Sequence, residues 1–304
     1  MWDARAVQSR RSQAAAQQSG ISVPAMRGRA FLRGITPPYV ASAARRVRAR
    51  RQLPTWAYMG TAWVNEDGEE GWNAETVARH YANKLDAFRA SIASPKCIGV
   101  PTEALAGFTP TQYNQNVALG YAHAVARAAS GSRRISILDW GGGFGFMAFL
   151  VRELFPEVEL DFHVKEVPAT ARAAREHVDT VTFWDDDTCL DREYDLVSAC
   201  GSLQYSSDWR SVLTQLGSAG SFLYLSRTPV ADTATSYVVR QHAYGTSYVS
   251  WVLSRTDLLA VAKAAGLTLE RELLEGWSAD VPGAPARDEA RGYLFSKRAT
   301  RDPV

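Results

Sequence analysis

A glycine-rich segment in the middle of the chain carries the residues best suited to hold a ligand. The stretch Ile135–Gly145 reads Ile-Ser-Ile-Leu-Asp-Trp-Gly-Gly-Gly-Phe-Gly. An apolar run that ends in Asp139 and is followed by glycines and an amphipathic segment predicts a strand, a tight turn and a helix. Glycine permits positive φ and close approach of a ligand to the backbone, and a helix N-terminus offers unpaired N–H groups. Asp139 can accept hydrogen bonds from a cationic or hydroxyl-bearing ligand.

Two kinds of nucleotide site compete for this turn. Gly143-x-Gly145-x-x-Ala148 fits the GxGxx(G/A) dinucleotide fingerprint, but in that fingerprint the strand runs almost directly into the first glycine. Here Asp139 comes first, and a carboxylate repels a pyrophosphate, whereas it would attract the ammonium group of a sulfonium amino acid. The turn therefore resembles the first motif of class I S-adenosylmethionine-dependent methyltransferases. An NAD(P)-dependent oxidoreductase is the alternative from another class.

A second acid follows at a spacing that nucleoside-binding folds use. The segment 159–166 alternates in polarity like a half-buried strand and ends in Glu166, 21 residues after Gly145. An acid about twenty residues beyond the turn, at the tip of the second strand, is placed to bind ribose hydroxyls. Glu166 as a plain surface acid is the competing interpretation.

Strand and helix patterns alternate around these motifs, which is typical of an α/β protein with a doubly wound sheet. We expect strands at 135–139, 159–166, 180–184, 194–200, 221–227, 267–274 and 292–297. We expect helices at 72–93, 111–129, 145–154, 168–177, 207–217 and 254–265, with another beginning at Thr36-Pro37-Pro38. The seven strands match the Rossmann-like sheet of class I methyltransferases, whose order is 3-2-1-4-5-7-6. The expected organisation is a basic, disordered or loosely packed arm (1–33), a helical cap (34–130) and a core (131–300) with a substrate-loop insertion at about 230–253.

A narrower resemblance rests on motifs that occur in order over about residues 34–298. They are the Thr-Pro-Pro helix, the Trp/Tyr-containing helix at 72–88, Leu-Asp-Trp-Gly-Gly-Gly at 138–143, Ser-Leu-Gln-Tyr at 202–205, Arg-Thr-Pro at 227–229, and Gln241, Ser247-Tyr248 and Trp251. Together they resemble a little-characterised bacterial family of methyltransferases from polysaccharide and secondary-metabolite gene clusters. One departure is that the family's Ser-Tyr-Pro-x-Trp reads Ser-Tyr-Val-Ser-Trp at 247–251.

The resemblance implies S-adenosylmethionine as cofactor, S-adenosylhomocysteine as its product, and no metal. The cofactor-binding residues that it implies are Asp139, Gly141, Gly142, Gly143, Gly145, Glu166, Trp184, Asp185, Cys200 and Gly201. Trp184 and Asp185 end the third strand, where the superfamily holds adenine. Cys200 and Gly201 end the fourth, beside the methionine portion.

The acceptor is expected above the ends of the fourth and fifth strands. The candidate substrate-binding residues are Tyr113, Gln204, Tyr205, Arg227, Gln241, Tyr244 and Trp251. Several are aromatic and suit a flat acceptor, whereas Arg227 suits a carboxylate. For catalysis we expect His242 as general base, because unperturbed imidazole titrates near neutral pH. Tyr248 is a second catalytic candidate, and His123 is the alternative general base.

Composition limits the other function classes. Residues 1–51 contain eleven arginines and one acid, a net charge of +10, while the remainder has 23 basic and 31 acidic residues, a net charge of −8. An acidic core disfavours nucleic-acid modification, although a basic arm can bind anionic partners. Three widely spaced cysteines indicate a reducing compartment, and no apolar run is long enough to span a bilayer. The Arg-to-Lys bias suggests a high-GC bacterium.

The sequence thus predicts a cytoplasmic enzyme that transfers a methyl group to a small-molecule acceptor, with no nucleic-acid partner, and that could be a homodimer. O-methylation in secondary metabolism or glycan biosynthesis is the main expectation. C- or N-methylation of an aromatic natural product, an indole or a phenol, is the alternative within the class.

Overall fold

The computed structural model describes residues 55–64, 71–100 and 111–297, all of which belong to one compact unit, Gln52–Val304. The expected arm at 1–33 and the Thr-Pro-Pro helix lie outside the described residues. Within them, no helix combines the length and apolar character needed to cross a membrane.

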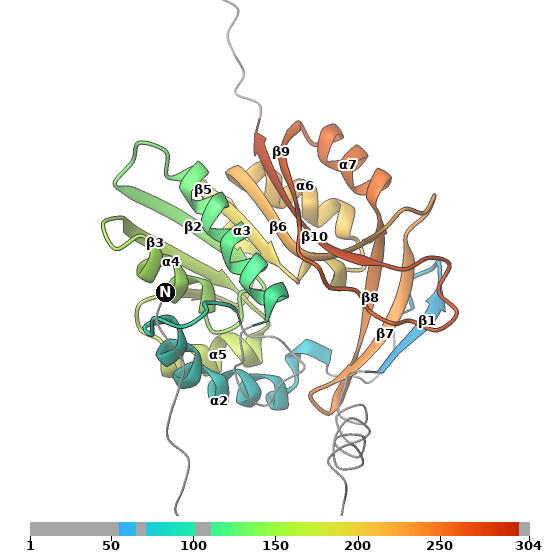
Figure 1. The fold of residues 1–304 in the computed structure, drawn as a ribbon, viewed down its shortest axis with the longest axis horizontal. Helices are drawn as coiled ribbons and strands as arrows, with labels where there is room; N and C mark the ends of the chain where they lie inside the picture. The colour runs from blue at the N-terminus through green and yellow to red at the C-terminus, as the bar shows by residue number, and fades with distance from the viewer. Residues whose placement is uncertain (1–54, 65–70, 101–110, 298–304) are drawn as a thin grey trace, which may run out of the picture. The chain divides into compact units, whose positions relative to one another are not determined.

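A parallel sheet forms the centre of the described chain (Figure 1). Its strands are β2 Arg134–Trp140, β3 Glu159–Lys165, β4 Thr182–Trp184, β5 Tyr194–Cys200 and β6 Gly220–Ala231. Strand β2 pairs with β3 on one side and with β5 on the other, β3 pairs with β4, and β5 pairs with β6. The chain therefore leaves the first strand in opposite directions, and the carboxyl ends of β2 and β5 face a crevice of the kind in which open α/β sheets bind ligands.

Two antiparallel strands complete the set that the sequence predicts. Strand β10, Glu289–Lys297, pairs with β6, and β9, Leu267–Leu274, pairs with β10. All seven predicted strands are found within a few residues of their expected limits, and the α/β fold class is confirmed.

The structure of residues 237–251 differs from the loop expected there. The segment was expected to be an irregular insertion, but it forms β7, Tyr237–Ala243, and β8, Thr246–Ser254, an antiparallel hairpin. Strand β1, Thr55–Gly60, pairs with the outer edge of β7, and β8 pairs with the end of β6. Both strands are buried along most of their length, so they lack the period-2 alternation by which a half-buried strand is recognised in a sequence.

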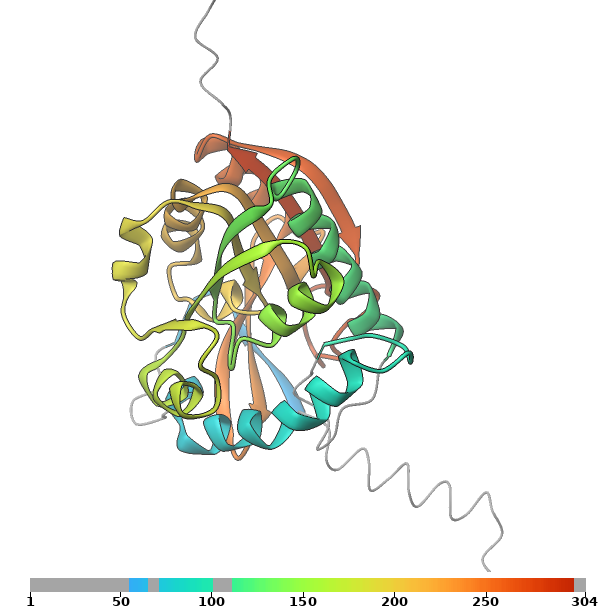
Figure 2. The ribbon, with the colours of Figure 1, turned by 90° about the vertical axis from the view of Figure 1, so that its left-hand side faces the viewer.

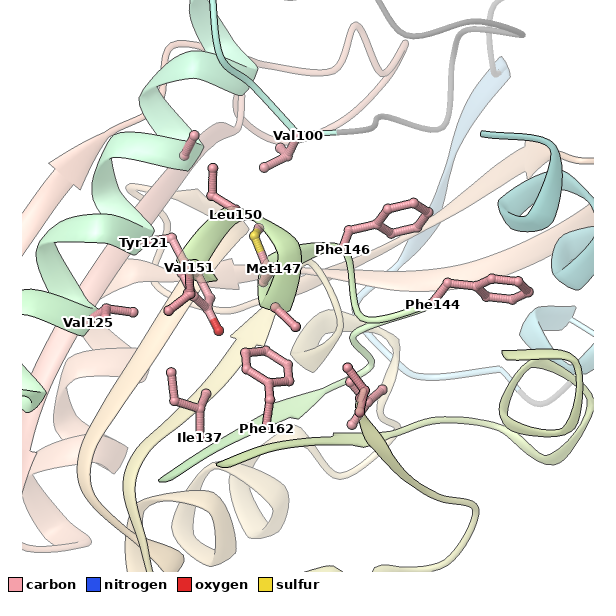
Figure 3. Close-up of a cluster of buried hydrophobic side chains, with 14 of the residues drawn as sticks. Val100, Tyr121, Val125, Ile137, Phe144, Phe146, Met147, Leu150, Val151 and Phe162 are labelled. Atoms are coloured by element: carbon pink, nitrogen blue, oxygen red, sulfur yellow. The ribbon is translucent and has the colours of Figure 1, made fainter. Parts of the chain in front are cut away.

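Helices cover both faces of the sheet (Figures 1 and 2). They are α2 Glu75–Ile92, α3 Gln112–Ala128, α4 Phe146–Leu154, α5 Pro168–His177, α6 Trp209–Ala219 and α7 Arg255–Ala264, all at predicted places. Neighbouring strand residues point to opposite faces, so Ile137 packs with α3 and α4 in one core cluster and Leu138 packs with α6 and α7 in the other. Figure 3 shows the first cluster, in which Phe162 lies beneath Met147 and Leu150 of α4.

Helix α3 brings a hydrogen-bonding side chain to the centre of the sheet. Its N-cap Thr111 forms a capping box with Asn114. A β-carbon at Gly120 would lie 2.4 Å from the hydroxyl oxygen of Tyr224 on β6, so glycine is what lets the helix approach this closely. The close approach places the Tyr121 hydroxyl 3.1 Å from Oγ of Ser198 on β5.

Gly120→Ala should destabilise the protein. The new methyl group would collide with Tyr224, which is fully buried. Overpacking costs about 1–3 kcal/mol, and a 2.4 Å contact with a fully buried ring puts this case in the upper part of that range. Alanine regains roughly 1 kcal/mol in helix propensity, so we expect a net loss of about 1–2 kcal/mol in urea unfolding. In a Tyr224→Phe background the loss should shrink, because the colliding oxygen is gone. Equal stability of Gly120→Ala and wild type would contradict this packing.

Candidate functional site

A cavity opens at the carboxyl ends of the parallel strands, where the topology predicts a ligand site. Residues at the ends of four strands line it. They are Trp140 at the end of β2 and Gly141 to Gly143 after it, Glu166 and Val167 after β3, Gly201 and Ser202 after β5, and Arg227 at the bend of β6. The remaining lining residues are Trp72, Tyr81, Lys84, Val100, Asp139, Phe146, Met147, Lys165, Cys200, Tyr205, Ser206 and Tyr244. Segments that are far apart in sequence therefore share one cavity.

Asp139 is the most unusual group in this cavity. Its side chain is 1% exposed. Oδ1 accepts a hydrogen bond from Ser198 Oγ at 2.8 Å, whereas Oδ2 is buried with no hydrogen-bond partner among the described residues. Burial raises the pKa of Asp139 to about 7, against the opposing effect of the Ser198 hydrogen bond and with a further contribution from Glu166. A buried carboxylate oxygen that lacks a partner is costly, and a cation bound in the cavity would satisfy it.

The glycine turn closes directly over this carboxylate. Gly141, Gly143 and Gly145 have φ values of 73°, 61° and 72°, which side-chain-bearing residues adopt at a cost. A β-carbon at Gly142 would lie 2.6 Å from Asp139 Oδ2, so only glycine allows the backbone to pass this close. Gly145 is the N-cap of α4, and Figure 3 shows the helix continuing from it into the core.

Glu166 links the turn to the end of β3. Oε1 accepts a hydrogen bond from the Gly143 N–H and Oε2 accepts one from the Val167 N–H, both at 2.9 Å. Burial raises the pKa of Glu166, against the effect of the two backbone hydrogen bonds. Each carboxylate oxygen can accept a second hydrogen bond, so Glu166 can hold the turn and still bind hydroxyl groups in the cavity.

Arg227 enters the cavity from β6 with an unusual backbone. Its φ is 53°. Its N–H donates to Glu275 Oε2 at 2.8 Å, and its Nε donates to the Tyr113 hydroxyl at 3.3 Å. Burial raises the pKa of Glu275 to about 7. The buried carboxylate thus holds the backbone bend that directs the Arg227 side chain across Gly201.

An aromatic wall faces the glycine turn. We give this name to Trp72, Tyr81, Tyr205 and Tyr244, which all line the cavity. The Trp72 ring lies 4.8 Å from that of Tyr205, and the Tyr244 ring lies 6.2 Å from Trp72 and 6.3 Å from Tyr81.

Most of the predicted cofactor residues lie together. Asp139, Gly141, Gly142, Gly143, Glu166, Cys200 and Gly201 line the cavity. Three do not: Gly145 is the N-cap of α4, the Trp184 indole N–H donates to His163 Nδ1 at 3.1 Å, and Asp185 pairs with Arg175 at 3.2 Å. These contacts serve the end of β4 and leave the proposed adenine contact without a geometric basis.

The predicted acceptor residues divide in the same way. Tyr205, Arg227 and Tyr244 line the cavity. Gln241 and Tyr113 stand behind them, because Gln241 Oε1 accepts from the Tyr205 hydroxyl at 3.0 Å and Tyr113 accepts from Arg227. The remaining candidates, Gln204 and Trp251, are buried beside the cavity wall, where the Trp251 indole N–H donates to the Ser207 carbonyl.

The expected catalytic residues do not reach the cavity. His242 is exposed on β7 and His123 is exposed on α3. Tyr248 is buried behind Trp72, with ring centroids 4.1 Å apart. Strand alternation explains the outward position of His242, because its neighbour Gln241 takes the inward position. The described residues also contain no group of three or more His, Cys, Asp or Glu side chains that could hold a metal ion.

Several lining residues were missed from the sequence. Tyr81 and Lys84 are three apart on α2 and share a face, and neither was among the candidate site residues. Trp140 directly follows Asp139, and the Lys165 ammonium lies 4.2 Å from its ring centroid. A lysine that is 2% exposed, as Lys84 is, cannot be foreseen from helical periodicity alone.

No family model and no curated protein matches the chain, whereas solved structures do. The CcbJ methyltransferase from Streptomyces caelestis has 16% identity and a TM-score of 0.43, over 72% of this chain and 98% of that one. CalS10, an amino pentose methyltransferase from Micromonospora echinaspora, has 12% identity and a TM-score of 0.40, over 62% and 92%. An S-adenosylmethionine-dependent methyltransferase from Clostridium acetobutylicum has 11% identity and a TM-score of 0.42, over 61% and 92%.

All three structures are described as methyltransferases, the class that the sequence resembles. At these identities and TM-scores the likeness does not by itself assign an activity to this chain.

The raised pKa of Asp139 predicts a measurable effect of pH on stability. Between about pH 4 and pH 7 the folded protein holds a proton on Asp139 that the unfolded chain releases. Stability should therefore fall as pH rises through this window and level off above it. Asp139→Asn should make the slope less negative, by up to about 1.4 kcal/mol per pH unit, in urea unfolding at pH 5, 6 and 7.

Glu275 and Asp288 have pKa values raised in the same direction, to about 7 and about 6, so part of the slope should persist in Asp139→Asn. Parallel curves for variant and wild type would show that Asp139 is ionised in the folded protein throughout the window.

Proposed function

We propose that this protein is a cytoplasmic S-adenosylmethionine-dependent methyltransferase that acts on a small-molecule acceptor, with O-methylation as the expected reaction. The observation that carries the proposal is the buried, unpartnered Oδ2 of Asp139 beneath the glycine turn. It is a site for a cation at the position where the sheet topology places a ligand. Free thiols at Cys97, Cys189 and Cys200 are in keeping with a reducing compartment.

The residues present fit this cofactor. Asp139 would pair with its ammonium group, the backbone of Gly141–Gly143 would lie along it, and Glu166 would accept hydrogen bonds from its ribose hydroxyls. When bound, S-adenosylmethionine supplies a methyl group on a positively charged sulfur. A carboxyl with a pKa of about 7 can ionise when a cation arrives, which ties recognition of the cofactor to its positive charge.

The chain's contribution to the reaction would be alignment. A methyl transfer needs the acceptor in line with the bond that breaks, and fixed orientation supplies much of the rate. No histidine is among the lining residues in the described part of the chain, so the proposal uses neither His242 nor His123 as a base. An acceptor that is already ionised at neutral pH, or that releases its proton to water, suits this cavity.

Two alternatives make different demands on the same cavity. C- or N-methylation of an aromatic natural product would use the same donor site with another acceptor atom. An NAD(P)-dependent oxidoreductase would have to place a pyrophosphate against the glycine turn, where Asp139 and Glu166 both oppose negative charge.

Calorimetry with the purified chain separates these classes. S-adenosylhomocysteine should bind with a one-to-one stoichiometry, and NAD and NADP should show no heat of binding, because only the first carries an ammonium group for Asp139. Binding of a dinucleotide but not of S-adenosylhomocysteine would refute the proposed function.

Glu166→Ala should weaken the binding of S-adenosylhomocysteine by about 1–3 kcal/mol, the cost of removing hydrogen bonds to a buried partner. The same titration checks it. Glu159→Ala is the matched control, because Glu159 starts the same strand at its opposite, exposed end. Equal losses in the two variants would show that the carboxyl end of β3 has no special role.

A further inference from the structure

We propose that the acceptor is a planar aromatic molecule and that Tyr244, at the tip of the β7–β8 hairpin, is a specificity-determining residue for it. The inference rests on the proposed function, since it assigns the half of the cavity that faces the donor site. It commits to a substrate class that the fold alone leaves open.

The first observation is the density of aromatic rings on this side. The Trp72 ring has Tyr205 at 4.8 Å and Tyr248 at 4.1 Å, the latter tilted by 31°. Tyr244 packs edge-on against Trp72, with ring centroids 6.2 Å apart, and its ring lies 4.4 Å from His80 and 6.3 Å from Tyr81. The separations of 4.8, 6.2 and 6.3 Å lie within the range of about 4.5–7 Å for favourable aromatic pairs, and those of 4.1 and 4.4 Å are shorter. Trp72, Tyr81, Tyr205 and Tyr244 all border the cavity, and the rings behind them hold them in place.

The second observation is the backbone of Tyr244. Its φ is 56°, and that of Gly245 is 78°. With Ala243 paired to Thr246, these two residues form the tight turn of a hairpin in which both central residues have positive φ. Asn, Asp and Gly are the residues that this turn favours, and a tyrosine there is strained. Strained backbone conformations of this kind cluster at functional sites, where the side chain contributes to binding or catalysis.

The strained turn and the aromatic wall meet at Tyr244. The hairpin is not part of the seven-stranded core that the sequence predicts; it is an addition whose turn carries a disfavoured residue into the cavity. A turn needed only to connect two strands would be built with Asn-Gly. A tyrosine placed there supplies a flat face, and flat faces bind aromatic acceptors by stacking.

The experiment compares ring and saturated forms of one acceptor shape on protein saturated with S-adenosylhomocysteine. Calorimetry would measure the affinity of 4-hydroxybenzoate against 4-hydroxycyclohexanecarboxylate, and of 1-naphthoate against decahydronaphthalene-1-carboxylate. Each pair has the same carboxylate, so the difference reports the ring. We expect the aromatic member to bind about three- to tenfold more tightly. Methyl glucoside, which tests a sugar acceptor, should bind no more tightly than the saturated acids.

Variants connect the preference to the wall. Tyr244→Asn keeps a residue suited to the turn but removes the ring, and should abolish the aromatic preference. Tyr244→Phe keeps the ring and should retain the preference. Circular dichroism and thermal melting report whether the asparagine variant has folded; if it has not, Trp72→Leu removes a different ring from the same wall and should have the same effect.

The outcomes separate the two proposals. Failure of S-adenosylhomocysteine to bind contradicts the proposed function. Normal binding of S-adenosylhomocysteine, with no aromatic probe favoured over its saturated partner, overturns only the acceptor class. If the preference for aromatic over saturated acids survives both Tyr244→Asn and Trp72→Leu, the aromatic wall does not determine which acceptor binds.

Discussion

One buried carboxylate constrains the whole site. Asp139 lies at the end of the central strand with one oxygen held by Ser198 and the other without a partner among the described residues. Ser198 in turn contacts Tyr121, which reaches the sheet because α3 has a glycine where it crosses Tyr224. A charge buried in this way is unfavourable unless it is protonated or paired, so the geometry that encloses it also makes it receptive to a cation. The glycine turn, α3 and β5 together enclose this carboxylate, and the free energy of burying its charge is the main constraint on their arrangement.

The glycine turn and the second acid act as one unit. Glu166 holds the Gly143 N–H, and Gly142 passes over Asp139 where no side chain would fit. The two carboxylates belong to neighbouring strands and meet only because those strands are parallel, which brings their carboxyl ends to the same edge. Lys165, stacked on Trp140 and paired with Asp187 at 3.3 Å, adds positive charge at the same edge. The side of the cavity along the sheet edge is therefore polar, and hydrogen bonds and an ion pair hold its side chains in place.

The opposite side is built differently. Trp72 and Tyr81 come from the helical segment before the sheet, and Tyr244 comes from the hairpin beyond it. Two residues with left-handed backbone, Arg227 and Tyr244, direct their side chains to this region. The protein thus places its backbone strain on the side that we propose for the acceptor, where specificity among related molecules would be decided. The carboxylates and glycines at the sheet edge hold their positions without a strained residue of this kind.

The sequence by itself determined the seven core strands, the six described helices and the residues at the carboxyl edge of the sheet. Local hydrophobic periods located the strands and helices, and the acid-glycine pattern of 139–145 and the spacing to Glu166 located the residues at the sheet edge, because both signals are local in the chain. The tertiary structure decided the rest. Which of Gln241 and His242 faces inward depends on the register of β7 against β8 and β1, and a shift of one residue would exchange them. The aromatic wall joins residues separated by more than 170 positions, and their meeting is set by long-range packing that no local pattern encodes.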